Sequence, residues 1–191
     1  MNKNGNIIIQ AGGKGIRMYN NTWNRPKALI PVLGKPILLH FLETFKNWNP
    51  IIVGDYKFEK IKISLKYIFN LKNYKCIKTS DEGSLAGLKK AFSQIKNKRP
   101  IILAWSDLFI FKKPNLSKIN KKKMTIFVTD QFRCRYIVEK NGIFLNKKNI
   151  HKNGIIGLFH LPSKKLVEKN FPNSGEFVEW IKNQNIQFTT K

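Results

Sequence analysis

The sequence predicts a single α/β domain whose open, largely parallel sheet is covered by helices on both faces. Over most of the first 130 residues, short apolar runs of strand length alternate with amphipathic segments of helical spacing. This alternation is typical of parallel sheets with crossover helices. The chain has 191 residues and is 42% hydrophobic, which suffices for one compact core but falls short of two ordinary domains.

The strands and helices of this part can be assigned in order. The predicted strands cover residues 6–12, 50–56, 74–80, 99–107 and 124–130. The predicted helices cover 35–48, 58–69 and, after a loop, the rest of 81–96. Pro36 suits the first turn of the first helix. The second helix should bury Ile61, Leu65 and Ile68 along one face, and the third should bury Leu85, Leu88 and Phe92.

The pattern changes after residue 130. Residues 135–146 read as a hairpin around Asn141-Gly142, a favoured two-residue turn. Another strand is predicted at 153–162, and a helix at 174–183 with Ser174 as its cap. We therefore expect residues 131–191 to decorate the sheet without extending its regular winding, inside one domain that covers 1–191.

The formal net charge of +25 suggests an anionic partner such as nucleic acid, an acidic membrane face or phosphorylated small molecules. However, the basic residues are mostly lysine and are scattered along the chain. Proteins that read nucleic acid grooves usually gather arginine in one element. Lysine, asparagine, isoleucine and phenylalanine also share AT-rich codons, so coding bias explains the charge better than a nucleic-acid surface does.

Cysteine spacing and hydropathy indicate the compartment. Cys76 and Cys134 belong to no C-x-x-C motif, so neither a zinc site nor a disulfide framework is predicted. This pattern is compatible with a reducing compartment. The first apolar run, Ile7 to Ile9, is too short for a signal peptide or a membrane span, and no later run is long enough. We expect a cytoplasmic protein without membrane insertion, and its oligomeric state stays open.

Three polar features follow predicted strands at their carboxyl ends. The loop "AGGKGIR" (11–17) follows the first strand, "DEGS" (81–84) follows the third, and Asp107 ends the fourth. Ligands of open α/β sheets bind beyond the carboxyl ends of the strands. We therefore expect these features to converge on one crevice, although they are spread over nearly a hundred residues.

The residue types in this crevice suit phosphate chemistry. Glycine N–H groups allow close approach of phosphate oxygens, Arg17 offers a planar fork, and Lys27 adds a compact charge. The spacing is neither that of a P-loop nor of a dinucleotide fingerprint. Asp107 interrupts an apolar run, where a carboxylate needs a partner such as Mg²⁺. The plainer alternatives are a flexible turn with two exposed cations and a surface aspartate.

The segment "QAGGKGIRM…T…PKALIPVLGKP" resembles the N-terminal signature of the sugar-phosphate nucleotidyltransferases. That signature reads A-[AG]-G-x-G-T-R-[LM], then a threonine, then P-K-x-[LM]-x-P-[VI]-x-G-K-P. The distance from Arg17 to Lys27 fits it, as does the position of Thr22 between them. The later segments "GSLAGL" (83–88), "IILAWSDLFI" (101–110) and "GIIGLFHL" (154–161) extend the resemblance over most of the chain.

The resemblance implies a Rossmann-like nucleotidyltransferase fold, in which about 1–130 bind the nucleotide and 131–191 the acceptor. It also implies attack by an acceptor phosphate on the α-phosphorus of an NTP, with release of pyrophosphate. Nucleotide-binding residues would be Ala11, Gly12, Gly13, Gly15 and Gly83. Of the two proposed catalytic residues, Arg17 would bind the triphosphate together with Gly15, and Lys27 would bridge the reacting phosphates. Asp107 would ligate Mg²⁺.

The sequence departs from this family at several positions. Gln10 replaces an apolar residue, Ile16 a threonine, Leu85 an alanine and Ser106 a glycine. Larger members carry a second metal-binding aspartate beyond the helix that "SGEFVEW" resembles. Glu176 or Glu179 takes that role here, or the site is incomplete, or the chain is a piece of a longer enzyme. The sequence leaves these alternatives open.

The favoured function is transfer of a nucleoside monophosphate from an NTP to a sugar phosphate or a small phosphorylated alcohol, as in nucleotide sugar biosynthesis. The compact length slightly favours CTP, which several compact members use. The alternatives are a molybdopterin-type or isoprenoid-type nucleotidyltransferase and a non-catalytic basic nucleic-acid-binding domain on the same fold. A nucleotide-sugar glycosyltransferase is disfavoured because Asp107 belongs to no D-x-D motif.

Overall fold

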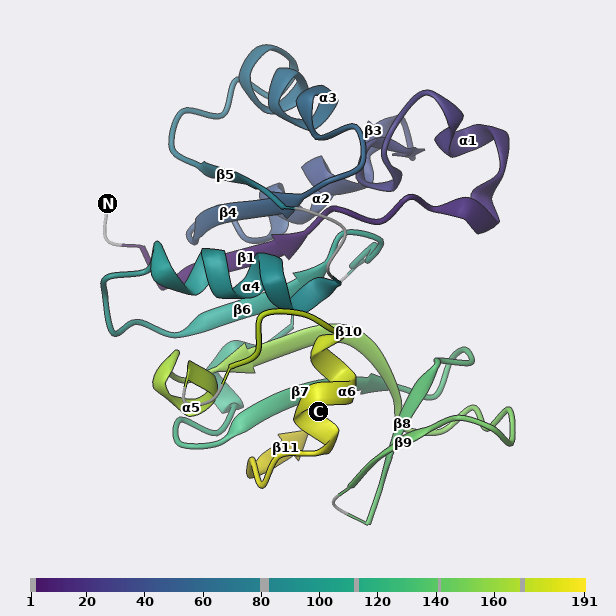
Figure 1. Cartoon of the computed structure of the whole chain (residues 1–191), viewed down its shortest axis with the longest axis vertical. Coiled ribbons are helices and arrows are strands. Elements are labelled where there is room, and N and C mark those ends of the chain that lie inside the picture. The colour runs from purple at the N-terminus through teal and green to yellow at the C-terminus, as the bar shows by residue number, and fades with distance from the viewer. Residues whose placement is uncertain (1–2, 80–82, 112–113, 141, 169–170) are drawn as a thin grey trace.

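The computed structural model describes residues 3–79, 83–111, 114–140, 142–168 and 171–191. Its main sheet has the strand order β11-β7-β10-β6-β1-β4-β5 (Figure 1). In chain order these strands are β1 (Asn6–Gln10), β4 (Asn49–Gly54), β5 (Lys75–Lys78), β6 (Ile101–Trp105), β7 (Met124–Thr129), β10 (Gly154–Leu161) and β11 (Phe188–Thr190). The hairpin strands are β8 (Tyr136–Glu139) and β9 (Gly142–Leu145), and β2 (Pro31–Val32) pairs separately with β3 (Lys35–Pro36).

The helices lie between these strands. They are α1 (Asn20–Trp23), α2 (Ile37–Thr44), α3 (Phe58–Ile63), α4 (Ser84–Ser93), α5 (Lys165–Glu168) and α6 (Phe177–Lys182). Short 3-10 turns cover Ile16–Met18, Lys27–Leu29 and Leu116–Lys118, and a π-helical turn covers Ser64–Ile68. The predicted α/β class is confirmed, and every strand and helix predicted in the first 130 residues is present, with shorter bounds.

The strands β6, β1, β4 and β5 form the parallel half of the sheet. Gln10 at the end of β1 is in register with Val53 of β4 and with Trp105 of β6. Because the strands run in one direction and in this register, their carboxyl ends meet at the same edge. The loops that follow them therefore start close together, as the sequence predicts.

The strand β10 corrects the expectation that residues 131–191 only decorate the sheet. It lies between β6 and β7 and is antiparallel to both, so the C-terminal third supplies a central strand (Figure 1). Its sequence "GIIGLFHL" is buried at seven of eight positions, which suits a strand covered on both faces. Sequence pattern predicts such a strand but does not say between which neighbours it is inserted.

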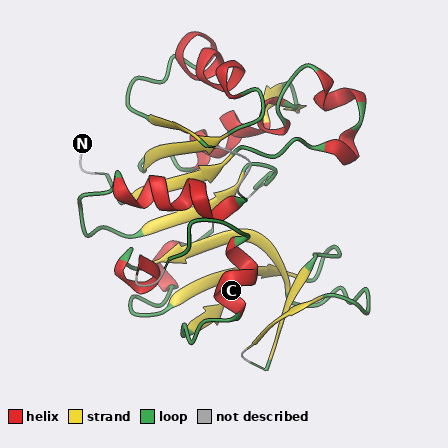
Figure 2. Ribbon diagram, viewed as in Figure 1, coloured by secondary structure: helices red, strands yellow, loops and turns green. Residues whose placement is uncertain are grey.

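Helices cover both faces of the sheet, as predicted (Figure 2). The helices α4, α5 and α6 pack on one face, and their core includes Leu85, Leu88 and Phe92 as expected. The helices α2 and α3 pack on the other face. Alternate residues of β1 serve the two cores, with Ile8 in the first and Ile7 and Ile9 in the second.

Local details differ from the sequence prediction at three places. Ile61 and Leu65 are fully buried, but Ile68 is 69% exposed. The π-helical turn explains this difference. The Phe69 N–H bonds to the Ser64 carbonyl five residues earlier, and this wider turn shifts Ile68 out of the 3.6-residue spacing. Pro36 lies in β3, just before α2. The hairpin β8–β9 is confirmed, although its turn residue Asn141 is outside the described residues.

Within the described part of the chain, none of the helices combines the length and the apolar character needed to cross a membrane. Cys76 and Cys134 are free thiols, and burial raises the pKa of the Cys76 thiol to about 11. A thiol with a raised pKa carries little thiolate at neutral pH, so neither a nucleophilic nor a redox role is indicated for Cys76.

His160 in β10 makes the stability of this fold pH-dependent. The side chain is 5% exposed, and burial lowers the pKa of His160 to about 4. The folded state therefore favours the neutral ring, whereas the unfolded chain takes up a proton near pH 6.5. We expect the contribution of His160 to the free energy of unfolding to be constant above about pH 6.5 and to fall between pH 6.5 and 4.

Urea unfolding at pH 7.5 and 5.0 measures this effect. His160→Leu should lose less stability between the two pH values than the unsubstituted protein. His151→Leu, at an exposed position, is the matched control and should keep the wild-type difference. An equal pH dependence in His160→Leu would show that other groups cause the loss.

Candidate functional site

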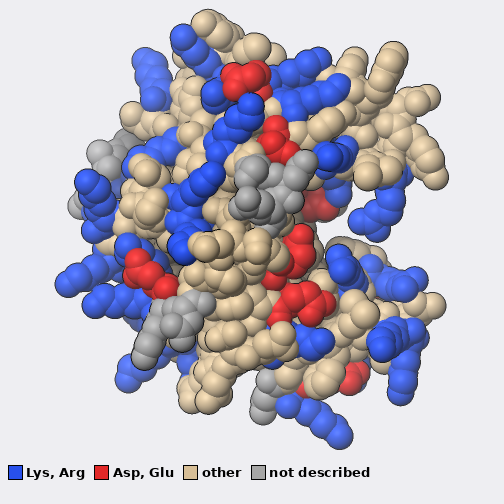
Figure 3. All heavy atoms as spheres, viewed as in Figure 1, with Lys and Arg blue, Asp and Glu red and all other residues tan. Residues whose placement is uncertain are grey.

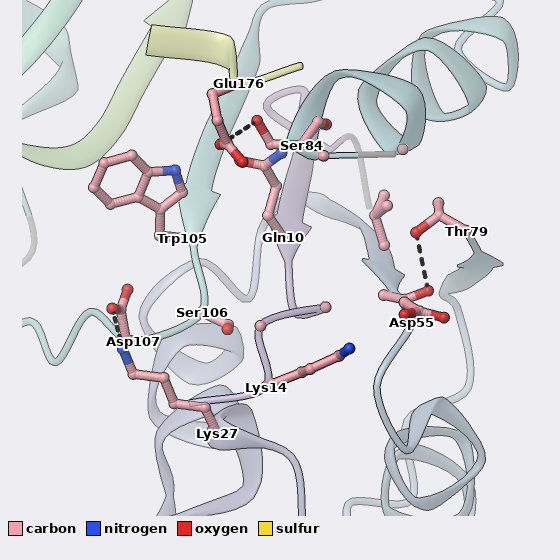
Figure 4. Close-up of a pocket in the computed structure, with 16 residues that line it drawn as sticks. Gln10, Lys14, Lys27, Asp55, Thr79, Ser84, Trp105, Ser106, Asp107 and Glu176 are labelled. Atoms are coloured by element: carbon pink, nitrogen blue, oxygen red, sulfur yellow. Dashed lines mark hydrogen bonds and ion pairs between the residues drawn. The ribbon is translucent and has the colours of Figure 1, made fainter. Parts of the chain in front are cut away.

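A cavity of about 410 Å³ opens at the edge where the parallel strands end (Figure 4). Its walls come from the loops after β1, β4, β5 and β6, from the first turn of α4, and from the segment before α6. Residues that carry polar side chains in it are Gln10, Lys14, Lys27, Asp55, Thr79, Ser84, Ser106, Asp107 and Glu176. Segments that are far apart in sequence therefore form one site, as the strand-end argument predicts.

The glycine loop after β1 forms the floor of the cavity through Gly12 and Gly13. A Cβ on Gly12 would approach the backbone nitrogen of Asp55 to 3.2 Å, so the loop lies close against the end of β4. A Cβ on Gly13 would meet nothing within 4 Å, so this backbone is open to a ligand. Within the described part of the chain, neither N–H group takes part in a hydrogen bond, which leaves two donors for an anion or a base.

The following arm, residues 14–25, is held in shape by Thr22. Gly15 has a φ of 66°, a conformation that glycine adopts without strain. The Thr22 hydroxyl, which is buried, donates to the Gly15 carbonyl over 3.1 Å. The signature threonine thus has a structural role here, since it closes the loop that carries Arg17.

Lys27 and Asp107 meet at one end of the cavity. The Lys27 Nζ lies 2.5 Å from Asp107 Oδ2 and donates to it. Lys27 begins a 3-10 turn, and Asp107 lies two residues beyond β6, so 80 residues of sequence separate the pair. Their side chains are 24% and 36% exposed. The pair is thus accessible to a phosphate or a metal ion that would separate or bridge the two charges.

The opposite wall depends on a close contact between Gly83 and Gly175. Gly83 has a φ of 83°, and a Cβ there would come within 2.5 Å of the Gly175 carbonyl oxygen. The same carbonyl accepts a hydrogen bond from the Leu85 N–H at 3.0 Å. The segment before α6 is therefore docked on the first turn of α4 and reaches the cavity.

Ser84 joins these two segments through its side chain. Its hydroxyl donates to Glu176 Oε2 at 2.9 Å and accepts from the Phe177 N–H at 2.8 Å (Figure 4). The second bond satisfies a free donor at the start of α6, which is the role predicted for Ser174. That prediction is wrong, because the capping hydroxyl comes from a residue 93 positions away along the chain.

Gln10 completes the wall below Ser84. Its Nε2 donates to the Ser84 carbonyl at 3.0 Å, and its amide end lies beside Ser84 and Glu176 (Figure 4). Its own carbonyl Oε1 is buried and has no hydrogen-bond partner among the described residues. Gln10 thus contacts the first residue of α4.

The cavity brings together most of the predicted site residues. Gly12, Gly13, Gly83, Lys27 and Asp107 all line it. Three other predicted residues, Ala11, Gly15 and Arg17, are not among its lining residues. Arg17 is exposed on the 3-10 turn of the arm, and its binding role stays a prediction.

The two glutamates proposed as second metal ligands differ in position. Glu176 lines the cavity, whereas Glu179 lies outside it and forms an ion pair with Lys182 at 3.8 Å in α6. Of the two, only Glu176 lines the same cavity as Asp107, and it lies on the opposite wall. The other two alternatives stay open: the metal site is incomplete, or the chain is a piece of a longer enzyme.

Sequence reasoning missed Asp55, Thr79 and Lys14, which line the end of the cavity away from Asp107. Asp55 follows the apolar run "PIIVG" in the same way that Asp107 follows "IILAWS". The strand-end signal that indicates Asp107 is therefore also present at Asp55. Trp105 is half-buried and also lines the cavity.

Comparison with known families agrees with this geometry. Residues 7–120 match the model of the MobA-like NTP transferase domain. The chain belongs to this family. The match includes the glycine loop, Lys27, the first turn of α4 and Asp107, and it stops before the C-terminal third.

Curated relatives of the MobA-like protein align over limited stretches. The bifunctional protein GlmU of Methanocaldococcus jannaschii is 37% identical over 92 residues, which are 47% of this chain and 21% of that protein. The 2-C-methyl-D-erythritol 4-phosphate cytidylyltransferase of Bacteroides thetaiotaomicron is 46% identical over 46 residues, 24% of this chain and 20% of that one. The aligned part of the chain thus spans about a fifth of each relative.

Solved structures match the MobA-like protein over almost its whole length. HddC from Yersinia pseudotuberculosis has a TM-score of 0.72 at 20% identity and covers 97% of this chain and 89% of its own. The CTP:phosphocholine cytidylyltransferase LicC from Streptococcus pneumoniae has a TM-score of 0.71 at 20% identity, with coverages of 98% and 90%. These likenesses establish the fold.

The contact of Gly83 with Gly175 predicts the effect of a single methyl group. Gly83→Ala should reduce the free energy of unfolding by about 1–3 kcal/mol, because it adds both a positive-φ strain and a clash with the Gly175 carbonyl. Chemical unfolding measures this loss. Gly13→Ala, whose Cβ meets nothing, should stay close to the wild type. Equal stabilities of the two variants would contradict the docked position of the segment before α6.

Proposed function

We propose that this MobA-like protein transfers a nucleoside monophosphate from an NTP to a phosphorylated small molecule and releases pyrophosphate. The observation that carries the proposal is the Lys27–Asp107 pair in the same cavity as the free N–H groups of Gly12 and Gly13. A cation, a carboxylate and backbone donors are the groups that phosphoryl chemistry needs. The family match over residues 7–120 supports the same reaction class.

The chain's own residues position the reactants and neutralise their charge. Lys27 binds the oxygens of the reacting α-phosphate and acceptor phosphate, and this requires its bond with Asp107 to open. Arg17 on the neighbouring arm binds the leaving pyrophosphate. Gly12, Gly13 and Gly83 line the same cavity and receive the nucleoside. Such chemistry relies on positioning and charge more than on proton transfer, so the site needs no acid–base pair.

A magnesium ion is proposed to bind at Asp107. Within the described residues no group of three or more histidine, cysteine, aspartate or glutamate side chains could enclose a metal. Mg²⁺ is instead commonly held by one or two carboxylates together with substrate phosphates, and Asp107 and Glu176 both line this cavity. When bound, the ion would neutralise phosphate charge. Asp107 would be its main ligand from the chain.

The acceptor is proposed to be a sugar phosphate or a phosphorylated alcohol, with CTP slightly favoured as the nucleotide. The names of the relatives support this range, since one is a 2-C-methyl-D-erythritol 4-phosphate cytidylyltransferase and another is CTP:phosphocholine cytidylyltransferase. The C-terminal third contributes Glu176 to the cavity, which supports an acceptor-binding role for residues 131–191. Molybdopterin-type and isoprenoid-type acceptors stay within the same reaction class.

Replacing the charged residues of the site should remove activity without unfolding the protein. We expect Lys27→Ala, Arg17→Ala and Asp107→Asn each to lower turnover by about 10²-fold or more, because each removes charge that neutralises the phosphates. The free energy of unfolding should change by less than about 1 kcal/mol, since these side chains are partly exposed. Pyrophosphate release with Mg²⁺, four NTPs and a panel of phosphorylated acceptors measures the turnover.

Lys35→Ala is a matched control, because Lys35 forms an exposed ion pair with Glu43 away from the cavity. It should keep wild-type turnover. A wild-type rate in Lys27→Ala would refute the role of Lys27. No turnover and no NTP binding by the intact wild-type protein would refute the function.

A non-catalytic nucleic-acid-binding role is the second candidate, and the charge distribution argues against it. Lysine and arginine side chains are spread over the visible face and gather over no single element (Figure 3). We expect binding to DNA and RNA duplexes to be weaker than about 10⁻⁶ M at 0.15 M salt, as for non-specific electrostatic binding. Fluorescence anisotropy measures this affinity. Nanomolar binding that survives this salt would reverse the order of the two candidates.

A further inference from the structure

Gln10 is a polar residue at a cavity position where the fold would accept an apolar one. It occupies the last position of β1, on the face that packs against α4, where the neighbouring Ile8 is fully buried. An apolar side chain would fit such a position without needing any hydrogen bond. A glutamine there must satisfy both an amide N–H₂ group and a carbonyl oxygen.

Only the N–H₂ group of the Gln10 amide has a hydrogen-bond partner among the described residues. The Nε2 donates to the Ser84 carbonyl at 3.0 Å, and this bond sets which way the amide faces. The Oε1 is then an acceptor that is buried and has no donor among the described residues. A buried acceptor without a donor is costly, so its presence in a stable fold calls for an explanation.

Three other buried polar atoms share this lack of a partner, but their positions differ. They belong to Trp48, Tyr136 and His160, and none of these residues lines the cavity. Gln10 does line it, between the glycine floor and the wall formed by Ser84 and Glu176. Of these four residues, only Gln10 therefore lies where a bound substrate can contact its side chain.

Its neighbour cannot satisfy this oxygen. The Glu176 side chain lies beside the Gln10 amide and accepts a hydrogen bond from the Ser84 hydroxyl (Figure 4). As a carboxylate, it offers only acceptor oxygens. This wall of the cavity thus presents amide and carboxylate acceptors, opposite the cationic end at Lys27. Because the Gln10 Oε1 is buried, rotation of the Gln10 or Glu176 side chain must accompany the approach of a donor group.

We propose that Gln10 is a specificity-determining residue whose carbonyl oxygen accepts a hydrogen bond from an O–H or N–H group of a substrate. The assignment rests on the proposed function and adds to it the residue that distinguishes between substrates. The donor is a hydroxyl or amino group of the nucleotide, or a hydroxyl of the acceptor. A site built to bind such a donor rejects analogues that lack it, because its polar atom is then left unpaired.

The test compares pairs of compounds that differ by a donor. The nucleotide pairs are CTP with UTP and CTP with 2′-deoxy-CTP, and the acceptor pair is glucose 1-phosphate with its 2-deoxy analogue. Nucleotide affinities come from calorimetry with Mg²⁺, and kcat and KM come from pyrophosphate release. The variant is Gln10→Met, which keeps the length of the side chain and removes both hydrogen-bonding groups.

We expect wild-type protein to favour the donor-bearing member of at least one pair by tenfold or more. In Gln10→Met this ratio should fall to within threefold of unity, mainly through the affinity or the KM of the donor-bearing compound. The pair that responds identifies whether the donor belongs to the nucleotide or to the acceptor. Gln94→Met, on the exposed end of α4, should keep every wild-type ratio.

The same measurements separate this role from a purely structural one. If Gln10 only supports the Ser84 loop, Gln10→Met weakens both members of each pair equally, and unchanged ratios overturn the assignment. Nucleotide binding with unchanged ratios leaves the proposed function intact and removes only the role of Gln10. Absence of binding to every NTP by the wild type would overturn the function and this assignment together.

Discussion

The parallel register of β1 with β4 and β6 is the constraint on which the site depends. Gln10 is aligned with Val53 on one side and with Trp105 on the other, so three loops leave the sheet at one level. This alignment brings the glycine loop, Asp55 and Asp107 to the lining of one cavity. Because side chains alternate along a strand, a shift of one residue in β6 would also exchange the faces of its buried residues. The packing of both cores thus protects the geometry of the cavity.

A second constraint is the docking of the C-terminal third on α4. Ser84 bonds to Glu176 and to the Phe177 N–H, and Gly83 leaves room for the Gly175 carbonyl. These contacts place the Glu176 carboxylate at a cavity whose other lining residues lie between Gln10 and Asp107. The family match ends before this segment. The wall of the cavity formed by the segment before α6 therefore lies outside the matched residues.

Much of the fold could be predicted from sequence, because apolar periodicity reports local structure directly. Leu85, Leu88 and Phe92 form a buried face at the expected spacing. Prediction failed where a feature depends on distant partners. The π-helical turn that exposes Ile68 has no periodic signal, and the position of β10 between β6 and β7 follows from sheet pairing that no local pattern encodes.

The sequence by itself determined the chemistry of this protein: a glycine loop, a lysine at a set distance and a carboxylate after a buried strand, all suited to phosphates. Only the tertiary structure decided which groups meet. It paired Lys27 with Asp107, placed Glu176 but not Glu179 at the cavity, and left one oxygen of Gln10 without a donor among the described residues. The physical reason is that residue types and spacings are local properties. Hydrogen bonds and ion pairs across 80 or more residues exist only once the sheet has formed.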